Sequence, residues 1–142
     1  MSRNAIKDLV HRYADAVIHR DAEQWAATWA VDAVWELGKE RRVEGREAIL
    51  ALWNSAMDGF VAVVQNVMNG AAQLDESTGT GTGRWYVQEH WHRADDERGL
   101  LLAYYDDTYS RVDGDWRFAI RELVVQYSGP SDLSGTFQNA WN

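Results

Sequence analysis

Apolar residues near the start of the chain recur with the period of an α-helix. They fall at positions i, i+3, i+4, i+7 and i+11 and are Ile6, Leu9, Val10, Tyr13 and Val17. This spacing predicts an amphipathic helix from about Asn4 to His19. Asp21 is a suitable N-cap for a second, short helix, in which Trp25 and Trp29 stack four positions apart.

A short strand and a third helix follow. The segment Ala33–Leu37 predicts a strand, and the polar run Gly38–Arg42 predicts the turn that ends it. A helix is predicted over Arg46–Met57, and Gly59 ends it. The apolar residues that share one face of this helix are Ile49, Leu50, Trp53, Ala56 and Met57.

Longer strands are predicted in the second half of the chain. They span Phe60–Leu74, Thr80–His92, Leu100–Val112 and Asp115–Tyr127. Gly70 indicates a bulge or bend in the first of them. The pair Asp113-Gly114 predicts a tight hairpin between the last two. We expect the tail, residues 128–142, to be irregular.

Helices followed by a meander of long strands define an α+β fold. Long antiparallel strands curl, and helices lying across the concave side of a curled sheet enclose a cone. We therefore expect a cone-shaped barrel, in which N-terminal helices and a curved, mixed, mostly antiparallel sheet close an apolar pocket. A length of 142 residues fits a single domain over residues 1–142.

The alternation of side chains predicts which residues face this pocket. One face of Thr80–His92 is apolar and carries Trp85, Val87, Glu89 and Trp91. In the next strand, Asp107 shares a face with Tyr105. If the hairpin turn that follows has two residues, Asp107 lies opposite Ile120, and Tyr105 lies opposite Glu122.

Three carboxylates, those of Glu89, Asp107 and Glu122, therefore fall on an otherwise apolar face. A buried carboxylate without a partner is costly, so it takes up a proton, pairs with a cation or borders water. One interpretation is an acid–base group in an apolar pocket. The other is structural: a bulge turns the side chain to the opposite face, or an arginine such as Arg121 or Arg84 pairs with it.

The net charge and the absence of cysteine reduce the number of possible functional classes. The chain has 14 basic and 22 acidic residues, a net charge of -8, which argues against nucleic acid or an anionic membrane as partner. It has no cysteine, which excludes a disulfide framework, a thiolate metal site and a cysteine nucleophile. The charges spread through the N-terminal segment are not typical of a signal peptide, so we expect a cytoplasmic protein.

Several polar residues have two interpretations. His90 and His92 are spaced as metal ligands are, but they lie on the polar face without a third ligand, so we expect no metal. Tyr13 either packs in the core or turns its hydroxyl group into the pocket. Gln65 and Asn69 share one face of a valine-rich strand, as pocket amides or as edge residues.

Short segments over about residues 4–134 follow one another in a distinctive order. They are Ala5-Ile6-Lys7-Asp8-Leu9, Tyr13-Ala14-Asp15-Ala16, Asp32-Ala33-Val34-Trp35, Gly45-Arg46-Glu47-Ala48-Ile49, Gly83-Arg84-Trp85-Tyr86, Tyr105-Asp106-Asp107 and Asp113-Gly114-Asp115-Trp116-Arg117-Phe118. In order and spacing they resemble the SnoaL-like family of the nuclear-transport-factor-2-like superfamily, in its scytalone dehydratase-like branch. The resemblance implies an α+β cone and cofactor-free elimination, isomerisation or hydrolysis of alicyclic or aromatic molecules.

Only some of the family's site residues have counterparts in this sequence. The helical tyrosine corresponds to Tyr13, and the strand acid of the dehydratase branch corresponds to Glu89. The catalytic aspartate and histidine of that branch fall at Ile18 and Gln65. Because neither of these side chains takes up a proton at neutral pH, the usual base is missing. The resemblance thus supports the fold more strongly than the mechanism.

Two functions remain open. The first is a cofactor-free lyase or isomerase acting on a hydrophobic cyclic, polyketide-like or steroid-like substrate. In that case Glu89 or Asp107 is the base, and Tyr13 and Gln65 bind the substrate oxygen. The second is a non-catalytic ligand-binding or assembly module, which the residues at positions 18 and 65 favour.

The remaining predictions concern the pocket lining and the assembly. We expect the substrate to be contacted by Val17, Ile18, Trp35, Trp53, Asn69, Trp85, Trp91, Tyr105 and Glu122. We expect no cofactor. A homodimer or homotrimer is predicted because the outer face of the sheet keeps Tyr86, Leu123 and Val125, and aromatic residues are enriched at interfaces.

Overall fold

Three helices and six strands form along residues 2–139 and 141, which the computed structural model describes. The helices are α1 (Ser2–His19), α2 (Ala22–Ala27) and α3 (Arg46–Met57). The strands are β1 (Trp29–Glu36), β2 (Arg42–Glu44), β3 (Phe60–Asp75), β4 (Thr80–Arg93), β5 (Arg98–Val112) and β6 (Asp115–Gly129). The predicted order of helices and long strands is confirmed.

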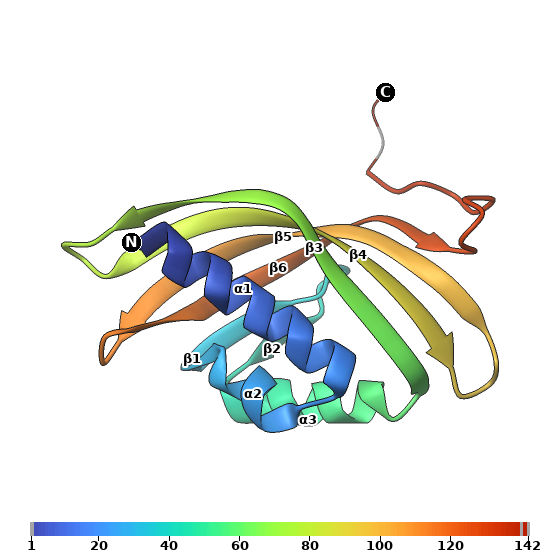
Figure 1. Ribbon diagram of the computed structural model, residues 1–142, viewed down its shortest axis with the longest axis horizontal. Helices are drawn as coiled ribbons and strands as arrows, with labels where there is room; N and C mark the ends of the chain where they lie inside the picture. The colour runs from blue at the N-terminus through green and yellow to red at the C-terminus, as the bar shows by residue number, and fades with distance from the viewer. Residues whose placement is uncertain (1, 140, 142) are drawn as a thin grey trace.

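The strands form a single sheet in the order β2-β1-β6-β5-β4-β3. β1 runs parallel to β6, and the other neighbouring strands are antiparallel. The long strands curve, and the helices lie on the concave side (Figure 1). Among the described residues β2 and β3 end the sheet without pairing with each other, so the cone is open rather than a closed barrel. The predicted α+β class with a mixed, mostly antiparallel sheet is confirmed.

Aromatic rings from α1, α2, α3 and β1 fill part of the concave side. Trp25 stacks on Trp53 with 4.5 Å between the ring centroids. Trp25, Trp29 and Trp35 meet at steep angles, with centroids 5.4–5.9 Å apart. All four indoles are buried. Trp35 and Trp53, which we expected to line a pocket, are therefore part of the hydrophobic core.

The second helix is shorter than predicted, because Trp29 belongs to β1. α2 ends at Ala27, and the Thr28 hydroxyl group donates to the Trp25 carbonyl oxygen at 2.6 Å, which closes the last turn. Trp29 instead pairs in parallel with Phe118 of β6. The two indoles still touch, at 5.6 Å, through packing of a helix on a strand rather than through helical spacing.

A bulge at Ala119 changes which side chains β6 turns inward. On the turn side of the bulge, β6 pairs with β5 in the register that a two-residue turn requires. Beyond it the register shifts by one residue, so that Asp107 lies opposite Arg121 rather than Ile120. Glu122 turns to the outer face and is exposed. The predicted inward position of Glu122 is therefore wrong.

A second bulge lies in β3 between Val67 and Gly70, as the glycine predicted. A side chain at Gly70 would not fit, since its Cβ atom would lie 2.5 Å from the indole of Trp85. Asn69 lies within the bulge and is exposed. The structure therefore does not bring Asn69 to the inner face with Gln65.

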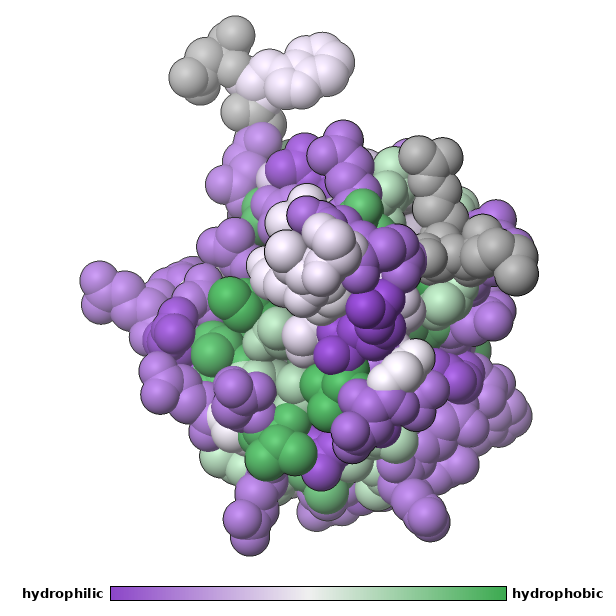
Figure 2. Space-filling view, turned by 90° about the vertical axis from the view of Figure 1, so that its left-hand side faces the viewer, coloured by the Kyte–Doolittle hydropathy of each residue, from purple (hydrophilic) through white to green (hydrophobic). Residues whose placement is uncertain are grey.

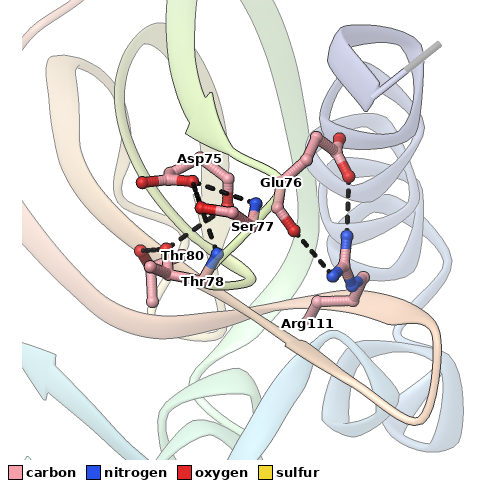
Figure 3. A network of polar contacts seen from close by, with 6 residues as sticks. All are labelled: Asp75, Glu76, Ser77, Thr78, Thr80 and Arg111. Atoms are coloured by element: carbon pink, nitrogen blue, oxygen red, sulfur yellow. Dashed lines mark hydrogen bonds and ion pairs between the residues drawn. The ribbon is translucent and has the colours of Figure 1, made fainter.

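Local polar contacts order the β3–β4 hairpin tip. Asp75 accepts hydrogen bonds from the backbone N–H groups of Ser77 and Thr78, at 3.0 and 3.3 Å (Figure 3). Arg111 at the end of β5 donates to the Glu76 carboxylate at 2.6 Å and to the Glu76 carbonyl oxygen at 2.9 Å. This end of the molecule is mainly hydrophilic, and its apolar residues lie in separate groups (Figure 2).

The strand β6 extends two residues into the segment that we expected to be irregular. Beyond it, the chain folds back on Tyr127, whose hydroxyl group donates to the Pro130 carbonyl oxygen. The Gly135 N–H donates to the same hydroxyl group at 3.1 Å, and Phe137 forms a bridge with Tyr127. The tail is thus attached to the end of the sheet by backbone and aromatic contacts.

Candidate active site

Glu89 and Gln65 form a polar pair on the inner face of the sheet. They lie directly opposite each other in β4 and β3, because the register of these strands places both side chains on the same side. The Gln65 amide nitrogen donates to Glu89 Oε1 at 3.1 Å. Gln65 is buried and Glu89 is partly buried. A carboxylate only accepts hydrogen bonds, so this contact fixes the orientation of the glutamine amide.

Burial raises the pKa of Glu89, while the hydrogen bond from Gln65 and the charge of Arg93 act in the opposite direction. The Arg93 guanidinium stands 5.0 Å from the ring of Phe60 and 5.3 Å from that of Trp91. Among the described residues, no basic side chain forms an ion pair with Glu89. Its carboxylate is therefore available to accept a proton.

Two buried phenols lie near this carboxylate. The hydroxyl groups of Tyr13, from α1, and Tyr105, from β5, are 3.4 Å apart. Burial raises the pKa of both phenols, and the negative charge of Glu89 raises each further. Both stay protonated at neutral pH and act as hydrogen-bond donors. The ring of Tyr13 therefore packs in the core, and its hydroxyl group lies next to that of Tyr105; a position of this hydroxyl group in a pocket remains a prediction.

Asp107 is held in a buried ion pair. Arg121 donates to its two oxygens, from Nε at 2.8 Å and from Nη2 at 3.2 Å. The Tyr109 hydroxyl group donates to the same carboxylate at 3.0 Å and accepts from the Trp85 indole at 2.9 Å. Burial raises the pKa of Asp107, and the Arg121 charge opposes this. The contacts make Asp107 a structural carboxylate, which was one of the two interpretations of the sequence.

Aromatic rings surround the cation of this pair. The Arg121 guanidinium lies 3.8 Å from the centroid of Tyr105, 4.0 Å from that of Phe118 and 4.4 Å from that of Tyr13. Such cation–π contacts and the bidentate carboxylate replace the water that a buried guanidinium loses. The ion pair therefore packs against both phenol rings, and Glu89 forms no ion pair with any basic side chain that the structure describes.

The other predicted lining residues divide into two groups. Val17 and Trp85 are buried in the core, and the Trp85 N–H is occupied by Tyr109. Ile18 at the end of α1 is 39% exposed, and Trp91 is partly buried two residues beyond Glu89. Gln65, Glu89, Tyr105 and Tyr13 therefore form the candidate site, and Trp91 lies two residues from Glu89 on the same face of β4.

None of the surface depressions described below is lined by Gln65, Glu89, Tyr105 or Tyr13. Depressions of about 340–630 Å³ on the described surface are formed by other residues. One of about 600 Å³ lies on the outer face and includes Glu36, Arg84 and Glu122. Another, of about 370 Å³, lies between α1, α2 and the β5–β6 hairpin. The apolar pocket next to Glu89 remains a prediction.

In the part of the chain that the structure describes, no group of three His, Cys, Asp or Glu side chains is arranged to hold a metal ion. His92 contacts Asp96 in the β4–β5 turn, at 2.7 Å. No described helix is long and apolar enough to cross a membrane.

The open α+β cone, with its helices on the concave side of the sheet, is the fold of the nuclear-transport-factor-2-like class. A model of the SnoaL-like domain matches residues 1–122, from α1 into β6, and the chain belongs to the SnoaL-like family. This confirms the resemblance seen in the sequence. A comparison with curated proteins found no match.

Solved structures share the fold over nearly the whole chain. LinA is 26% identical, with a TM-score of 0.83, and the match covers 98% of this chain and 94% of that chain. A type 2 hexachlorocyclohexane dehydrochlorinase (LinA) is 24% identical, with a TM-score of 0.83 and coverage of 98% and 93%. A putative scytalone dehydratase from Novosphingobium aromaticivorans DSM 12444 is 20% identical, with a TM-score of 0.85 and coverage of 98% and 93%.

Proposed function

We propose that the protein is a cofactor-free lyase or isomerase that acts on a hydrophobic cyclic substrate, with Glu89 as the base. The observation that carries this proposal is the state of the Glu89 side chain. It is a carboxylate on an apolar inner face, without an ion-pair partner among the described residues and with a pKa raised by burial. A base of this kind is better matched to a weakly acidic C–H group than an exposed glutamate is.

The reaction would begin with transfer of a carbon-bound proton to Glu89. The electron pair of the broken C–H bond forms a C=C bond, or an enolate if a carbonyl group is adjacent. In an elimination, the leaving group departs from the neighbouring carbon as chloride, or as water when Glu89 returns the proton to a hydroxyl group. In an isomerisation, Glu89 returns the proton to a different carbon. No electron acceptor is needed in either case.

Gln65 and the phenols have supporting roles in this proposal. Gln65 orients the Glu89 carboxylate through the 3.1 Å hydrogen bond. Tyr13 and Tyr105 present protonated hydroxyl groups, which suit an oxygen that gains negative charge in the transition state. The charge of Arg121 behind both rings favours that developing anion.

Two similar structures support the class of reaction. One carries the name of a hexachlorocyclohexane dehydrochlorinase and the other that of a putative scytalone dehydratase. Both names denote an elimination from a ring compound. In this proposal Glu89 serves as the base of an elimination or isomerisation of the same kind.

The second candidate function is a ligand-binding module without catalysis. It is favoured by Ile18 and Gln65, which stand where the dehydratase branch has its aspartate and histidine. Ile18 is 39% exposed and cannot orient a base, and Gln65 is not itself a base at neutral pH. In this case Glu89 would bind a hydrogen-bond donor of the ligand.

A substrate panel with Glu89→Gln separates the two functions. The panel contains hexachlorocyclohexane, hydroxylated tetralones and unsaturated cyclic ketones. Turnover is measured as chloride release or as a change in ultraviolet absorbance. We expect wild-type turnover on at least one compound, and a loss of about 10²–10⁴-fold in Glu89→Gln. Glu97→Gln, in the exposed β4–β5 turn, is the matched control and should retain wild-type activity. Ligand binding without turnover across the panel would instead favour the module.

A further inference from the structure

The strand β3 forms one edge of the sheet, and its outer side is unpaired (Figure 1). It pairs with β4 along one side, and among the described residues no other backbone group bonds to residues 61–74. In an antiparallel strand, alternate residues direct their N–H and C=O groups to the neighbouring strand, and the residues between them direct theirs away from it. About half of these main-chain groups are therefore left for water or for another chain.

The opposite edge of the sheet, β2, has the features by which proteins prevent unwanted pairing. Such features are a short strand and charged side chains. β2 has three residues, Arg42–Glu44, and two of them are charged. Arg42 forms ion pairs with Glu36 and Glu44 along this edge. β2 is therefore a poor template for a further strand.

β3 has none of these features over most of its length. Residues 60–74 include no charged residue and no proline. Val61, Val64 and Met68 are 65%, 43% and 58% exposed. The bulge between Val67 and Gly70 interrupts the edge, so the regular part is Ala62–Val67. A neutral segment of this length with high strand propensity and no proline pairs readily with an identical strand.

The distribution of charge favours a second copy of the chain as the partner. The chain has a net charge of -8, so two copies repel each other unless they meet where charge is absent. The depression on the outer face carries three carboxylates and one guanidinium, those of Glu36, Asp106, Glu122 and Arg84. The edge of β3 carries no charge that would repel a copy of itself or select a charged partner.

The edge is also complementary to itself. A two-fold axis brings an antiparallel strand opposite its own sequence, so that each free N–H group of one copy faces a C=O group of the other. Val64 lies near the middle of the regular part of the edge. An axis at Val64 pairs this residue with its own copy, Ala62 with Asn66, and Val63 with Gln65. All three pairs lie within the regular part.

We propose that β3 pairs with β3 of a second copy, antiparallel and about a two-fold axis at Val64. The two six-stranded sheets then continue into each other through the dimer. Gln65 and the second copy's Val63 lie opposite each other on the inner face, so the contact extends the sheet beside the Gln65–Glu89 pair. The proposal does not depend on the proposed function, since it requires only association.

Opposite charges at position 64 test the symmetry of this contact. Light scattering at micromolar concentration should give the wild type a mass of two chains. Val64→Lys and Val64→Glu each oppose two like charges at the axis, which should raise the dissociation constant of the dimer by about 10-fold or more. An equimolar mixture of the two variants opposes lysine to glutamate and should recover the mass of two chains. Val31→Lys, at a residue of β1 that is 70% exposed, is the matched control and should remain dimeric.

A single introduced cysteine gives a second measurement, because the chain has no cysteine of its own. Directly opposed residues of an antiparallel pair have Cα atoms about 4.5–5.5 Å apart, within the range that a disulfide spans. Val64→Cys should therefore form a disulfide-linked dimer on mild oxidation, and Val31→Cys should not. Cysteine is close to valine in size, so this test does not depend on the folding of the charged variants.

Several results would overturn the proposal. They are a wild-type mass of one or three chains, wild-type assembly of both charged variants, or a mixture that remains monomeric. Larger particles would indicate a contact that does not close about a two-fold axis, and they would also contradict it. Cross-linking of Val64→Cys that is no faster than that of Val31→Cys would exclude a two-fold axis at Val64.

Discussion

Glu89 destabilises the folded protein when it is ionised, because its carboxylate loses water on burial. Burial raises the pKa of Glu89 in the folded state above its pKa in the unfolded state. At pH values between these two pKa values, the folded state therefore binds more protons than the unfolded state. Stability therefore falls as pH rises through this window and stays lower above it. The group thus has an energetic cost that a purely structural residue at this position would avoid.

We expect Glu89→Gln to be more thermostable than the wild type at about pH 8 and equal to it at about pH 4, where the glutamate is largely protonated. Each 1 kcal/mol of stabilisation raises the Tm by about 2–8 °C. Thermal unfolding at both pH values measures the difference. The exposed Glu97→Gln controls for the loss of one negative charge. A variant that is less stable than the wild type at pH 8 would contradict this account.

The Asp107–Arg121 ion pair leads to a second prediction at the scale of single residues. Arg121→Met leaves the buried Asp107 carboxylate without its cation, and unfolding in urea should show a loss of about 3–5 kcal/mol. The double variant Asp107→Leu/Arg121→Met removes both charges and should recover most of this loss.

The exposed ion pair at the hairpin tip is the control for this series. Arg111→Met removes the contact with Glu76 (Figure 3) and should cost less than about 1 kcal/mol, because water solvates both charges. If Arg121→Met were no more destabilising than Arg111→Met, the interpretation of Asp107 as a structural carboxylate would be wrong.

At the scale of the elements, close contact between β3 and β4 depends on Gly70. A Cβ atom at this position would lie 2.4 Å from the Arg84 carbonyl oxygen and 2.5 Å from the Trp85 ring. Gly70→Ala should therefore destabilise the protein by about 1–3 kcal/mol, as overpacking does. Gly59→Ala is the control, since its nearest contact would be 3.4 Å, and it should change the stability by less than about 0.5 kcal/mol. Equal effects in urea unfolding would contradict the prediction.

The sequence predicted the elements that have strong periodicity. The stripe from Ile6 to Val17 marked α1, and the paired apolar runs marked the four long strands. Trp29 was placed in a helix because four-residue spacing fits helical stacking, whereas in the folded chain its pairing with Phe118 determines its conformation. The spacing of neighbouring residues gives no information about a strand partner so far away in the sequence.

Part of the site was also predictable. Alternation along β4 correctly placed Glu89 on the inner face, and the register with β3 then brought it to Gln65. The bulge at Ala119 has no glycine or proline to mark it, so the sequence allowed a bulge and a pairing with Arg121 as alternatives but did not show that Arg121 replaces Glu122 on the inner face. The unpaired edge of β3 follows from the order of the strands in the sheet, which also required a structure.

At the scale of the whole molecule, we propose that the protein forms a homodimer or homotrimer. The outer face of the sheet carries Tyr86 and Tyr104, whose rings are 5.3 Å apart, and Val64, which is 43% exposed. Leu123, which we expected on this face, packs instead on the inner side against Tyr105. Val125 lies opposite Ala103 of that inner cluster. The apolar surface proposed for assembly therefore consists of Tyr86, Tyr104 and Val64.

Light scattering at micromolar concentration measures the assembly directly. We expect a mass of two or three times the 16.2 kDa of one chain. Substitution of Tyr104 by lysine should reduce it, because a charge in the centre of an interface is costly to desolvate. A wild-type mass equal to that of one chain would contradict the proposal.

The central claim is that Glu89 removes a proton from a carbon atom of a ring-bearing substrate. The most direct test is the rate at which the hydrogen next to the carbonyl group of α-tetralone exchanges for deuterium in heavy water, followed by proton NMR. We predict that the wild type and Glu97→Gln accelerate this exchange equally and that Glu89→Gln lowers the acceleration by about 10²–10⁴-fold. Exchange at the wild-type rate in Glu89→Gln, or no acceleration by the wild type, would contradict the account.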